Sequence, residues 1–285
     1  MTRMSKFCFF GTPGVAAETL SALLAAGFTP ALVVTNPDAP RGRGLVLTPS
    51  PVKALALERG IPVSTPDALD EAAQKEIATY GCDYAVVVAY GKIFPEGLIN
   101  AFPKGVLNVH YSLLPKYRGA TPMEAALLNG DTETGVTIQK MVRALDAGDI
   151  LALEATPIAP NETARELRPR LLRLGAELLV ETLPKFERGE IVPRVQDSAR
   201  ATRARKFKKE DGCLDLADDA RENWNKYRAY ADTIGTHFFT ASGPRVKIKS
   251  AECAEGTFRV LSVVPEGKSE ISLQEFEAHG KKGAP

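Results

Sequence analysis

The first two thirds of the chain alternate short apolar runs with stretches of helical periodicity, and this alternation restricts the fold more than any other feature. The runs that predict strands lie at residues 6–10, 31–35, 61–63, 83–90, 105–110, 135–142 and 150–158. The stretches that predict helices lie at residues 15–26, 52–59, 67–79, 119–128 and 162–187, the last with a possible break near Pro169. Such alternation is typical of an open α/β sheet, because helices connect successive parallel strands.

The run at residues 83–90 is almost continuously apolar and rich in valine, which is typical of a strand buried on both faces of a parallel sheet. Beyond Gly189 the pattern changes. Residues 191–209 are polar, arginine-rich and without period, and short strand-like runs follow at 237–239, 246–248, 257–260 and 261–264. We therefore expect a Rossmann-like, mostly parallel sheet over residues 1–189 and a basic linker over 190–206. Residues 207–285 should form a small β-barrel of five to six strands, of the oligonucleotide-binding type.

Composition excludes several classes of protein. Lys and Arg total 36 against 35 Asp and Glu, and a formal net charge of +1 argues against a general nucleic-acid coat. No stretch approaches the ~18 apolar residues of a membrane span. The first apolar run stops at Gly11, too early for the core of a signal peptide. We therefore expect no membrane association.

The cysteines and histidines give no sign of a metal or disulfide framework. The four cysteines are scattered and the three histidines lie far apart, so no zinc-binding spacing is present. Scattered free cysteines fit a reducing compartment, and we expect a cytoplasmic protein without a metal.

The turn after the first strand, Gly11-Thr12-Pro13-Gly14, lacks the G-x-G-x-x-G pattern of a dinucleotide site. We interpret it as a tight turn that begins a helix, and we expect no nicotinamide cofactor. An anion bound at that helix N-terminus stays an open alternative. The chain also lacks the G-x-x-x-x-G-K-[ST] phosphate loop.

Charge is segregated along the chain. Residues 188–209 contain eight basic and two acidic side chains, whereas residues 210–222 contain six acidic and one basic. A local basic strip of this kind predicts salt-dependent, sequence-independent contact with phosphates. The alternative interpretation is a solvated linker face.

The most informative segment runs from Leu107 to Gly119. Asn108 and His110 are two residues apart in a predicted strand, so their side chains point to the same face. They lie at the carboxyl end of that strand, where open α/β sheets bind ligands. A second segment, residues 141–149, places Asp146 and Asp149 after another strand. That segment has an alternative interpretation as a solvated turn stabilised by aspartate.

Taken in order, these motifs resemble the methionyl-tRNA formyltransferase family, within the 10-formyltetrahydrofolate-dependent transferases. The resemblance rests on Phe10-Gly11-Thr12-Pro13, Val88-Ala89-Tyr90-Gly91, Asn108-Val109-His110, Ser112-Leu113-Leu114-Pro115, Arg118-Gly119-Ala120 and Leu145-Asp146-Ala147-Gly148-Asp149. It is strong over residues 6–190 and weaker beyond Asp211, where the C-terminal domain is shorter than is typical of the family. Leu45 and Val46 stand where the family usually has a basic pair.

The resemblance implies that the α-amino group of methionyl-initiator tRNA attacks the formyl carbon of 10-formyltetrahydrofolate. Asn108 and a protonated His110 would donate hydrogen bonds to the oxyanion, each such donor contributing ~3 kcal/mol. Asp146 would favour the imidazolium and receive the proton that leaves the amine. An α-amino pKa of about 7.7–8.0 leaves much of the amine neutral near pH 7, so little activation is needed.

The resemblance also implies contact residues for both substrates. For the folate these are Val88, Ala89, Tyr90, Gly91, Lys92, Ile93, Ser112, Leu113, Leu114 and Pro115. For the tRNA they are Arg41, Arg43, Lys206, Lys208 and Lys209. We expect a monomer. The alternatives are a formyltransferase acting on a sugar-nucleotide amine, a formyltetrahydrofolate hydrolase, a non-catalytic tRNA-binding protein and, as a weaker possibility, a dehydrogenase.

Overall fold

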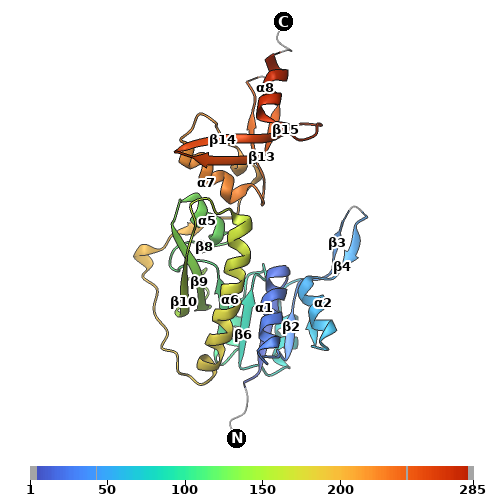
Figure 1. Ribbon diagram of the computed structural model, residues 1–285. Helices are drawn as coiled ribbons and strands as arrows, with labels where there is room; N and C mark the ends of the chain where they lie inside the picture. The colour runs from blue at the N-terminus through green and yellow to red at the C-terminus, as the bar shows by residue number, and fades with distance from the viewer. Residues whose placement is uncertain (1–4, 43, 242, 282–285) are drawn as a thin grey trace. The chain divides into compact units, whose positions relative to one another are not determined.

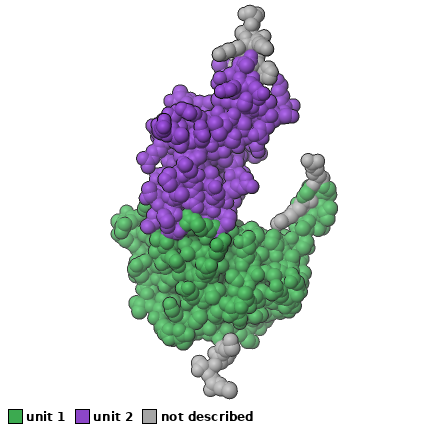
Figure 2. All heavy atoms as spheres, viewed as in Figure 1, with its two compact units in different colours: residues 1–118, 135–155, 170–203 green, residues 119–134, 156–169, 204–285 purple. Residues whose placement is uncertain are grey.

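The computed structural model describes residues 5–42, 44–241 and 243–281, and in these ranges the chain divides into two compact units (Figure 2). Unit 1 comprises Met1–Arg118, Gly135–Ala155 and Arg170–Arg203, and unit 2 comprises Gly119–Thr134, Thr156–Pro169 and Ala204–Pro285. Each unit is therefore assembled from three separate parts of the chain. Among the described residues, no helix has the length and apolar character that a membrane crossing requires.

A seven-stranded sheet with the order β10-β9-β7-β6-β1-β2-β5 forms the centre of the first unit. Its strands are β1 (Phe7–Gly11), β2 (Leu32–Val34), β5 (Val63–Ser64), β6 (Tyr84–Val88), β7 (Gly105–His110), β9 (Glu133–Lys140) and β10 (Ile150–Pro157). The pairs from β5 to β7 are parallel, whereas β7 and β9 are antiparallel. The sheet is thus mixed and mostly parallel, which confirms the predicted class.

The helices that accompany this sheet are α1 (Gly14–Ala25), α2 (Pro51–Glu58), α3 (Glu71–Ala78), α4 (Glu96–Asn100) and α6 (Ala164–Glu187). Figure 1 labels α1, α2 and α6. Local signals fix two of the starts, since the side chain of Ser50 accepts a bond from Lys53 N–H at α2 and that of Asp70 accepts one from Ala73 N–H at α3. Helix α6 is continuous through Pro169, where a break was possible.

The core of the central sheet is aromatic as well as aliphatic. Strands β1 and β6 are buried along their whole length, as the valine-rich run predicts. Phe10 makes edge-to-face contacts with Tyr90, Phe94 and Phe102. Burial of such rings is a large apolar contribution to stability, and it fixes the end of β6 beside the loop that follows.

Two pairs of short strands lie outside the two larger sheets of the described residues. Strands β3 (Ala39–Arg41) and β4 (Val46–Thr48) form an antiparallel hairpin, and β8 (Arg118–Gly119) pairs with β11 (Arg203–Ala204). Two 3₁₀ helices, η1 (Ser198–Arg200) and η2 (Lys209–Gly212), interrupt the arginine-rich segment.

Unit 2 contains a four-stranded antiparallel sheet with the order β12-β13-β14-β15. Its elements are β12 (Thr236–Phe239), β13 (Arg245–Ala254), β14 (Thr257–Pro265), β15 (Ile271–Ser272), α5 (Pro122–Leu128), α7 (Ala220–Tyr230) and α8 (Leu273–Lys281). The runs expected at 257–260 and 261–264 form one strand, β14. Four strands are fewer than the expected five to six, and this sheet is compatible with a small barrel.

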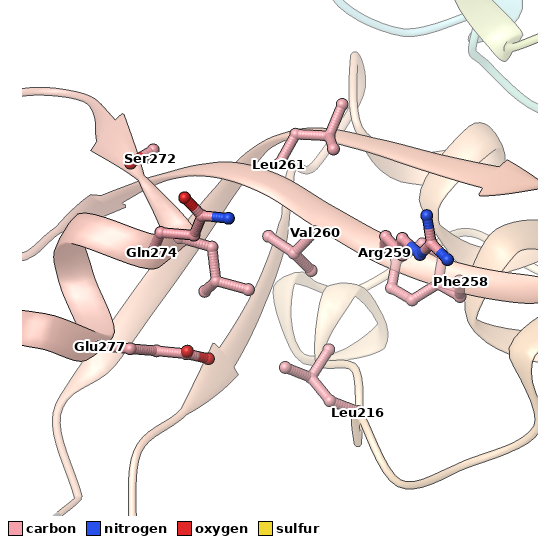
Figure 3. A pocket seen from close by; sticks show the side chains of 9 residues that line it. Leu216, Phe258, Arg259, Val260, Leu261, Ser272, Gln274 and Glu277 are labelled. Atoms are coloured by element: carbon pink, nitrogen blue, oxygen red, sulfur yellow. The ribbon is translucent and has the colours of Figure 1, made fainter.

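Helix α7 packs its aromatic face on the sheet of unit 2. Trp224 stacks on Tyr227, and both pack in a core with Ile248 and Val263. A cavity of about 430 Å³ lies between β14 and α8 (Figure 3). Apolar side chains line it together with polar ones, among them Arg259 and Glu277.

Candidate active site

Strand β7 presents Asn108 and His110 on one face of the sheet, as the alternation of strand side chains requires. Across the antiparallel pairing with β9, Asn108 lies opposite Gln139 and His110 opposite Thr137. Directly paired residues of neighbouring strands share a face, so these four polar side chains form one group. Asn108 is partly exposed, whereas His110 is buried.

Two protein groups orient the ring of His110. Its Nε2 lies 2.9 Å from the carbonyl oxygen of Tyr117. Because a carbonyl oxygen only accepts, Nε2 carries a proton and donates it. Nδ1 then faces Asp146, whose Oδ2 lies 3.7 Å away. That separation exceeds a direct hydrogen bond, and Nδ1 is the ring nitrogen left to face a reacting group.

Asp146 is held in place by a strained loop and by a neighbouring amide. Its φ of 49° lies in the left-handed region, which a residue with a side chain adopts only when its surroundings demand it. The Nε2 of Gln139 donates to Asp146 Oδ1 at 2.9 Å. The carboxylate side chain is only 12% exposed, so its charge acts on His110 with little screening by water.

Burial lowers the pKa of His110 from its ordinary value, because the charged imidazolium loses its hydration. The Asp146 carboxylate and the Tyr117 carbonyl oppose this effect, since both favour the protonated ring. Burial is the largest influence, so the neutral ring is favoured over the imidazolium expected from the sequence.

Gln139 belongs to this group and was missed by the sequence analysis. It is 1% exposed, and its Oε1 has no hydrogen-bond partner among the described residues. A buried amide oxygen without a partner is rare, and it adds an acceptor beside the His110 and Asp146 pair. A sequence signal for Gln139 does exist: polar Thr137 and Gln139 alternate with apolar Val136 and Ile138 in the predicted strand, which places the two polar side chains on one face.

Comparison with known proteins bears on the class of this site. A family model described as formyl transferase matches residues 5–183. The methionyl-tRNA formyltransferase of Citrifermentans bemidjiense is 39% identical and covers 100% of this chain, with 92% of the relative aligned. That of Marinobacter nauticus is 37% identical, and 97% of each chain is aligned. The chain belongs to the methionyl-tRNA formyltransferase family.

Solved structures share the fold of this formyltransferase family member. The sugar 3N-formyl transferase WlaRD matches with a TM-score of 0.68 at 21% identity, over 89% of this chain and 88% of that one. The N-formyltransferase from Helicobacter canadensis also gives 0.68, at 20% identity over 94% and 99%. Both were solved with a folate derivative present. These similarities show a shared fold.

In this formyltransferase chain, the residues expected to contact folate lie in two segments next to β7. The first segment begins with the last residue of β6 and continues into the loop that follows it, and it comprises Val88, Ala89, Tyr90, Gly91, Lys92 and Ile93. Strand β6 pairs with β7, and Val87 lies opposite Asn108. Ala89 and Gly91 have positive φ, which turns the backbone sharply at the end of the strand. Ile93 is 92% exposed, so this loop presents an apolar side chain to solvent.

The second folate segment comprises Ser112, Leu113, Leu114 and Pro115, which follow directly after His110. The Thr137 hydroxyl on β9 donates to the Ser112 carbonyl at 2.7 Å and accepts from Leu114 N–H at 3.2 Å. Ser112 Oγ donates to the Lys116 carbonyl at 2.6 Å. These bonds fix the loop next to the strand that carries Asn108 and His110.

The residues expected to contact tRNA are divided between the two units. The backbone of Arg41 lies in β3, whereas Arg43 lies outside the described residues. Lys206, Lys208 and Lys209 belong to unit 2 and are exposed. Beside them Arg205 forms an ion pair of 2.6 Å with Asp211, which lowers the pKa of that carboxyl to about 2. Asp211, from the acidic segment 210–222, therefore neutralises one charge of the basic segment 188–209.

Among the described residues, no group of three or more His, Cys, Asp and Glu side chains could hold a metal ion. Cys8 and Cys82 lie with their sulfurs 3.1 Å apart in the core, and both are free thiols.

Proposed function

We propose that this chain transfers the formyl group of 10-formyltetrahydrofolate to the α-amino group of methionyl-initiator tRNA, and that Asn108, His110 and Asp146 carry out the transfer. One observation carries the assignment of the site: Asn108 and His110 share a face of β7, and the Asp146 carboxylate lies 3.7 Å from His110 Nδ1. The identity to methionyl-tRNA formyltransferases, at 37–39% over nearly the whole chain, supports the choice of acceptor.

In this proposal the bond changes are balanced within the two substrates. The neutral amine forms a bond to the formyl carbon, and the bond from that carbon to N10 of the folate breaks. The amine loses one proton and N10 gains one, so no oxidant or reductant is involved. The protein therefore has to stabilise negative charge on the formyl oxygen and to transfer a proton.

Each of the three residues has a distinct role in this chemistry. Asn108 is partly exposed, and its amide N–H donates to the developing oxyanion. His110 acts through Nδ1, because its Nε2 donates to the Tyr117 carbonyl. Asp146 raises the affinity of Nδ1 for a proton and receives the proton that leaves the amine.

The folate site follows from the segments beside β7. We assign the pteridine to the loop formed by Val88, Ala89, Tyr90, Gly91, Lys92 and Ile93, where backbone groups are accessible at positive-φ positions. Ser112, Leu113, Leu114 and Pro115 form the neighbouring wall. The buried hydroxyl of Tyr90 has no hydrogen-bond partner among the described residues, so this loop also contains a polar group that a ligand or water can satisfy.

The tRNA contacts in this proposal are electrostatic. Arg41, Arg43, Lys206, Lys208 and Lys209 bind phosphates, a mode that depends on salt rather than on sequence. In chain order we propose a catalytic domain at 1–189, a basic linker at 190–206 and a C-terminal tRNA-contacting domain at 207–285, with segments 119–134 and 156–169 of the first packed in unit 2. A cytoplasmic monomer completes the proposal, because charged tRNA and the ribosome share that compartment. Light scattering of the purified chain tests the monomer.

The decisive experiment measures transfer of a radiolabelled formyl group to three acceptors: charged initiator tRNA, a sugar-nucleotide amine and water. We expect product only with the tRNA, and only with the chain that retains Asn108. Product with the amino sugar but not with tRNA would assign the chain to sugar formylation. Release of formate without any acceptor would identify a hydrolase.

A further inference from the structure

The arginine-rich segment 194–203, which we call the basic strap, makes close contacts with the active-site loops instead of acting as a free linker. Its side chains are exposed at Arg194, Arg200 and Arg203, but Gln196 is only 6% exposed. Backbone bonds of 2.8 and 2.9 Å pair Arg194 with Ile150. The strap therefore begins beside the loop that carries Asp146, and one of its side chains is buried there.

The amide of Gln196 links the Asp146 loop to Arg118. Its Nε2 donates to the carbonyl of Asp146 at 2.9 Å and to that of Gly148 at 2.7 Å. Its Oε1 accepts from Arg118 Nε at 3.1 Å and Nη2 at 2.8 Å. Guanidinium nitrogens only donate and carbonyl oxygens only accept, so this orientation of the amide is the one that satisfies all four partners.

A second residue of the strap, Thr202, holds the other group that contacts His110. Its Oγ1 accepts from Tyr117 N–H at 2.8 Å, and its backbone carbonyl accepts from Arg118 N–H at 2.9 Å. Tyr117 has a φ of 59°, and its own carbonyl receives the Nε2 proton of His110. Thr202 thus holds Tyr117 on both sides: its hydroxyl fixes the peptide before Tyr117, and its backbone carbonyl fixes the peptide whose carbonyl orients the imidazole.

We propose that Gln196 and Thr202 are positioning residues that hold the Asp146 carboxylate and the His110 ring in mutual register, so that the basic strap is part of the active site. The inference rests on the proposed role of His110 and Asp146 and extends it to residues that lie 50 and more positions further along the chain. Gln196 fixes the backbone of one partner, and Thr202 fixes the peptide bonded to the other.

The energetic reason for two such contacts lies in the strain at their targets. Asp146 and Tyr117 both have positive φ, a conformation that non-glycine residues leave when their surroundings loosen. The pair is separated by 3.7 Å, and a displacement of about 1 Å in such a constellation lowers the rate by about 10²-fold. Without Gln196 the loop relaxes and the Asp146 carboxylate moves away from His110. The His110 pKa then falls further, because the negative charge that opposed the effect of burial is more distant.

The test compares Gln196→Met and Thr202→Val with Thr202→Ser, which keeps the hydroxyl. Gln74→Met is the matched control, because Gln74 Nε2 also donates to a backbone carbonyl, that of Leu69 at 2.9 Å, outside the site. We measure kcat and the KM for charged tRNA across pH, and we follow the pKa of the His110 ring by NMR of its nitrogens.

We expect Gln196→Met and Thr202→Val to lower kcat about 10- to 100-fold while the KM for tRNA changes less than about twofold. The His110 pKa falls in Gln196→Met, and Thr202→Ser restores most of the activity that Thr202→Val loses. If Gln196→Met does not fold, the Thr202 pair decides the question.

Two results would overturn the inference. One is a kcat for Gln196→Met and Thr202→Val equal to that of Gln74→Met. The other is a lowered kcat with an unchanged His110 pKa and no recovery in Thr202→Ser, which is the pattern of a merely structural role. If Asn108→Ala is also fully active, the proposed catalytic site itself is wrong. If Asn108→Ala is inactive, only the role of the strap is wrong.

Discussion

At the scale of single residues, the amide of Asn108 and the ring of His110 make the sharpest prediction. We expect Asn108→Ala and His110→Ala each to lower the formylation rate by about 10²-fold or more, because each removes a group aimed at the reacting centre. Steady-state kinetics with charged initiator tRNA measure the loss. Gly14→Ala is a suitable control, because the Cβ that it adds would meet no other heavy atom within 4 Å. A fully active Asn108→Ala would refute the assignment.

The charge of Asp146 makes a prediction about pH. Asp146→Asn keeps the shape of the side chain but removes the negative charge that raises the His110 pKa against the effect of burial. We therefore expect the pKa of His110 to move to lower pH in this variant. The ring is then protonated only in more acidic solution, and the limb of the pH–rate profile that reports His110 shifts in the same direction. NMR of the ring nitrogens measures the pKa directly, and a shift to higher pH would contradict the geometry.

The close approach at Gly148 makes a third prediction. A Cβ added there would collide with the carbonyl oxygen of Lys140, a backbone atom that cannot move aside alone. We expect Gly148→Ala to displace the Asp146 loop and to lower kcat by about 10-fold or more. Folding is checked by circular dichroism, and activity equal to that of Gly14→Ala would contradict the prediction.

The sequence predicts only part of the residue-scale arrangement, for a physical reason. Asn108 and His110 are found because strand alternation relates side chains two positions apart. Gln139 and Gln196 are not found. The pairing of β9 with β7 places Gln139 opposite Asn108, and Gln196 reaches the Asp146 carbonyl through a contact between loops 50 residues apart. Local pattern contains no information about which distant backbone carbonyl an amide meets.

At the scale of helices and strands, the predicted elements of the central sheet are confirmed with small changes in their bounds. The valine-rich run forms β6 because two buried faces leave no place for alternating polar residues. Helix α6 continues through Pro169, since buried Leu171, Leu179 and Leu183 hold the rest of the helix. Helix α7 was not foreseen, because its mixed polar and aromatic sequence has little apolar content from which to read a period.

Helix α7 makes the prediction that belongs to this scale. Its N-cap, Asp219, accepts hydrogen bonds from the backbone N–H of Arg221 and Glu222 at 2.9 and 3.2 Å. We expect Asp219→Ala to lower the stability of unit 2 by about 1 kcal/mol. Trp224 is the only tryptophan of the chain and lies on this helix, so urea unfolding followed by its fluorescence reports the change. Asp232→Ala, at an exposed position after α7, is the control, and an equal effect of both would contradict the capping role.

At the scale of the whole molecule, the net charge of +1 conceals a basic stretch followed by an acidic one. We expect the triple variant of Arg194, Arg200 and Arg203 to Gln to weaken tRNA binding. Each lost phosphate contact should reduce the slope of log affinity against log salt by about 0.7–0.9. Filter binding across salt concentrations measures this slope. An unchanged slope would show that the basic strap does not contact phosphates.

The interleaving of the two units has a consequence for synthesis on the ribosome. Helix α5 belongs to unit 2, and its Leu127 carbonyl accepts a bond from Arg228, which is translated 101 residues later. Domains generally fold as their chain emerges, but unit 2 lacks most of its sheet until the last eighty residues have been made. A premature stop after residue 203 would thus leave the segments 119–134 and 156–169 without the rest of unit 2, against which they pack. Loss of the last third of the chain therefore affects segments that were translated long before the stop codon.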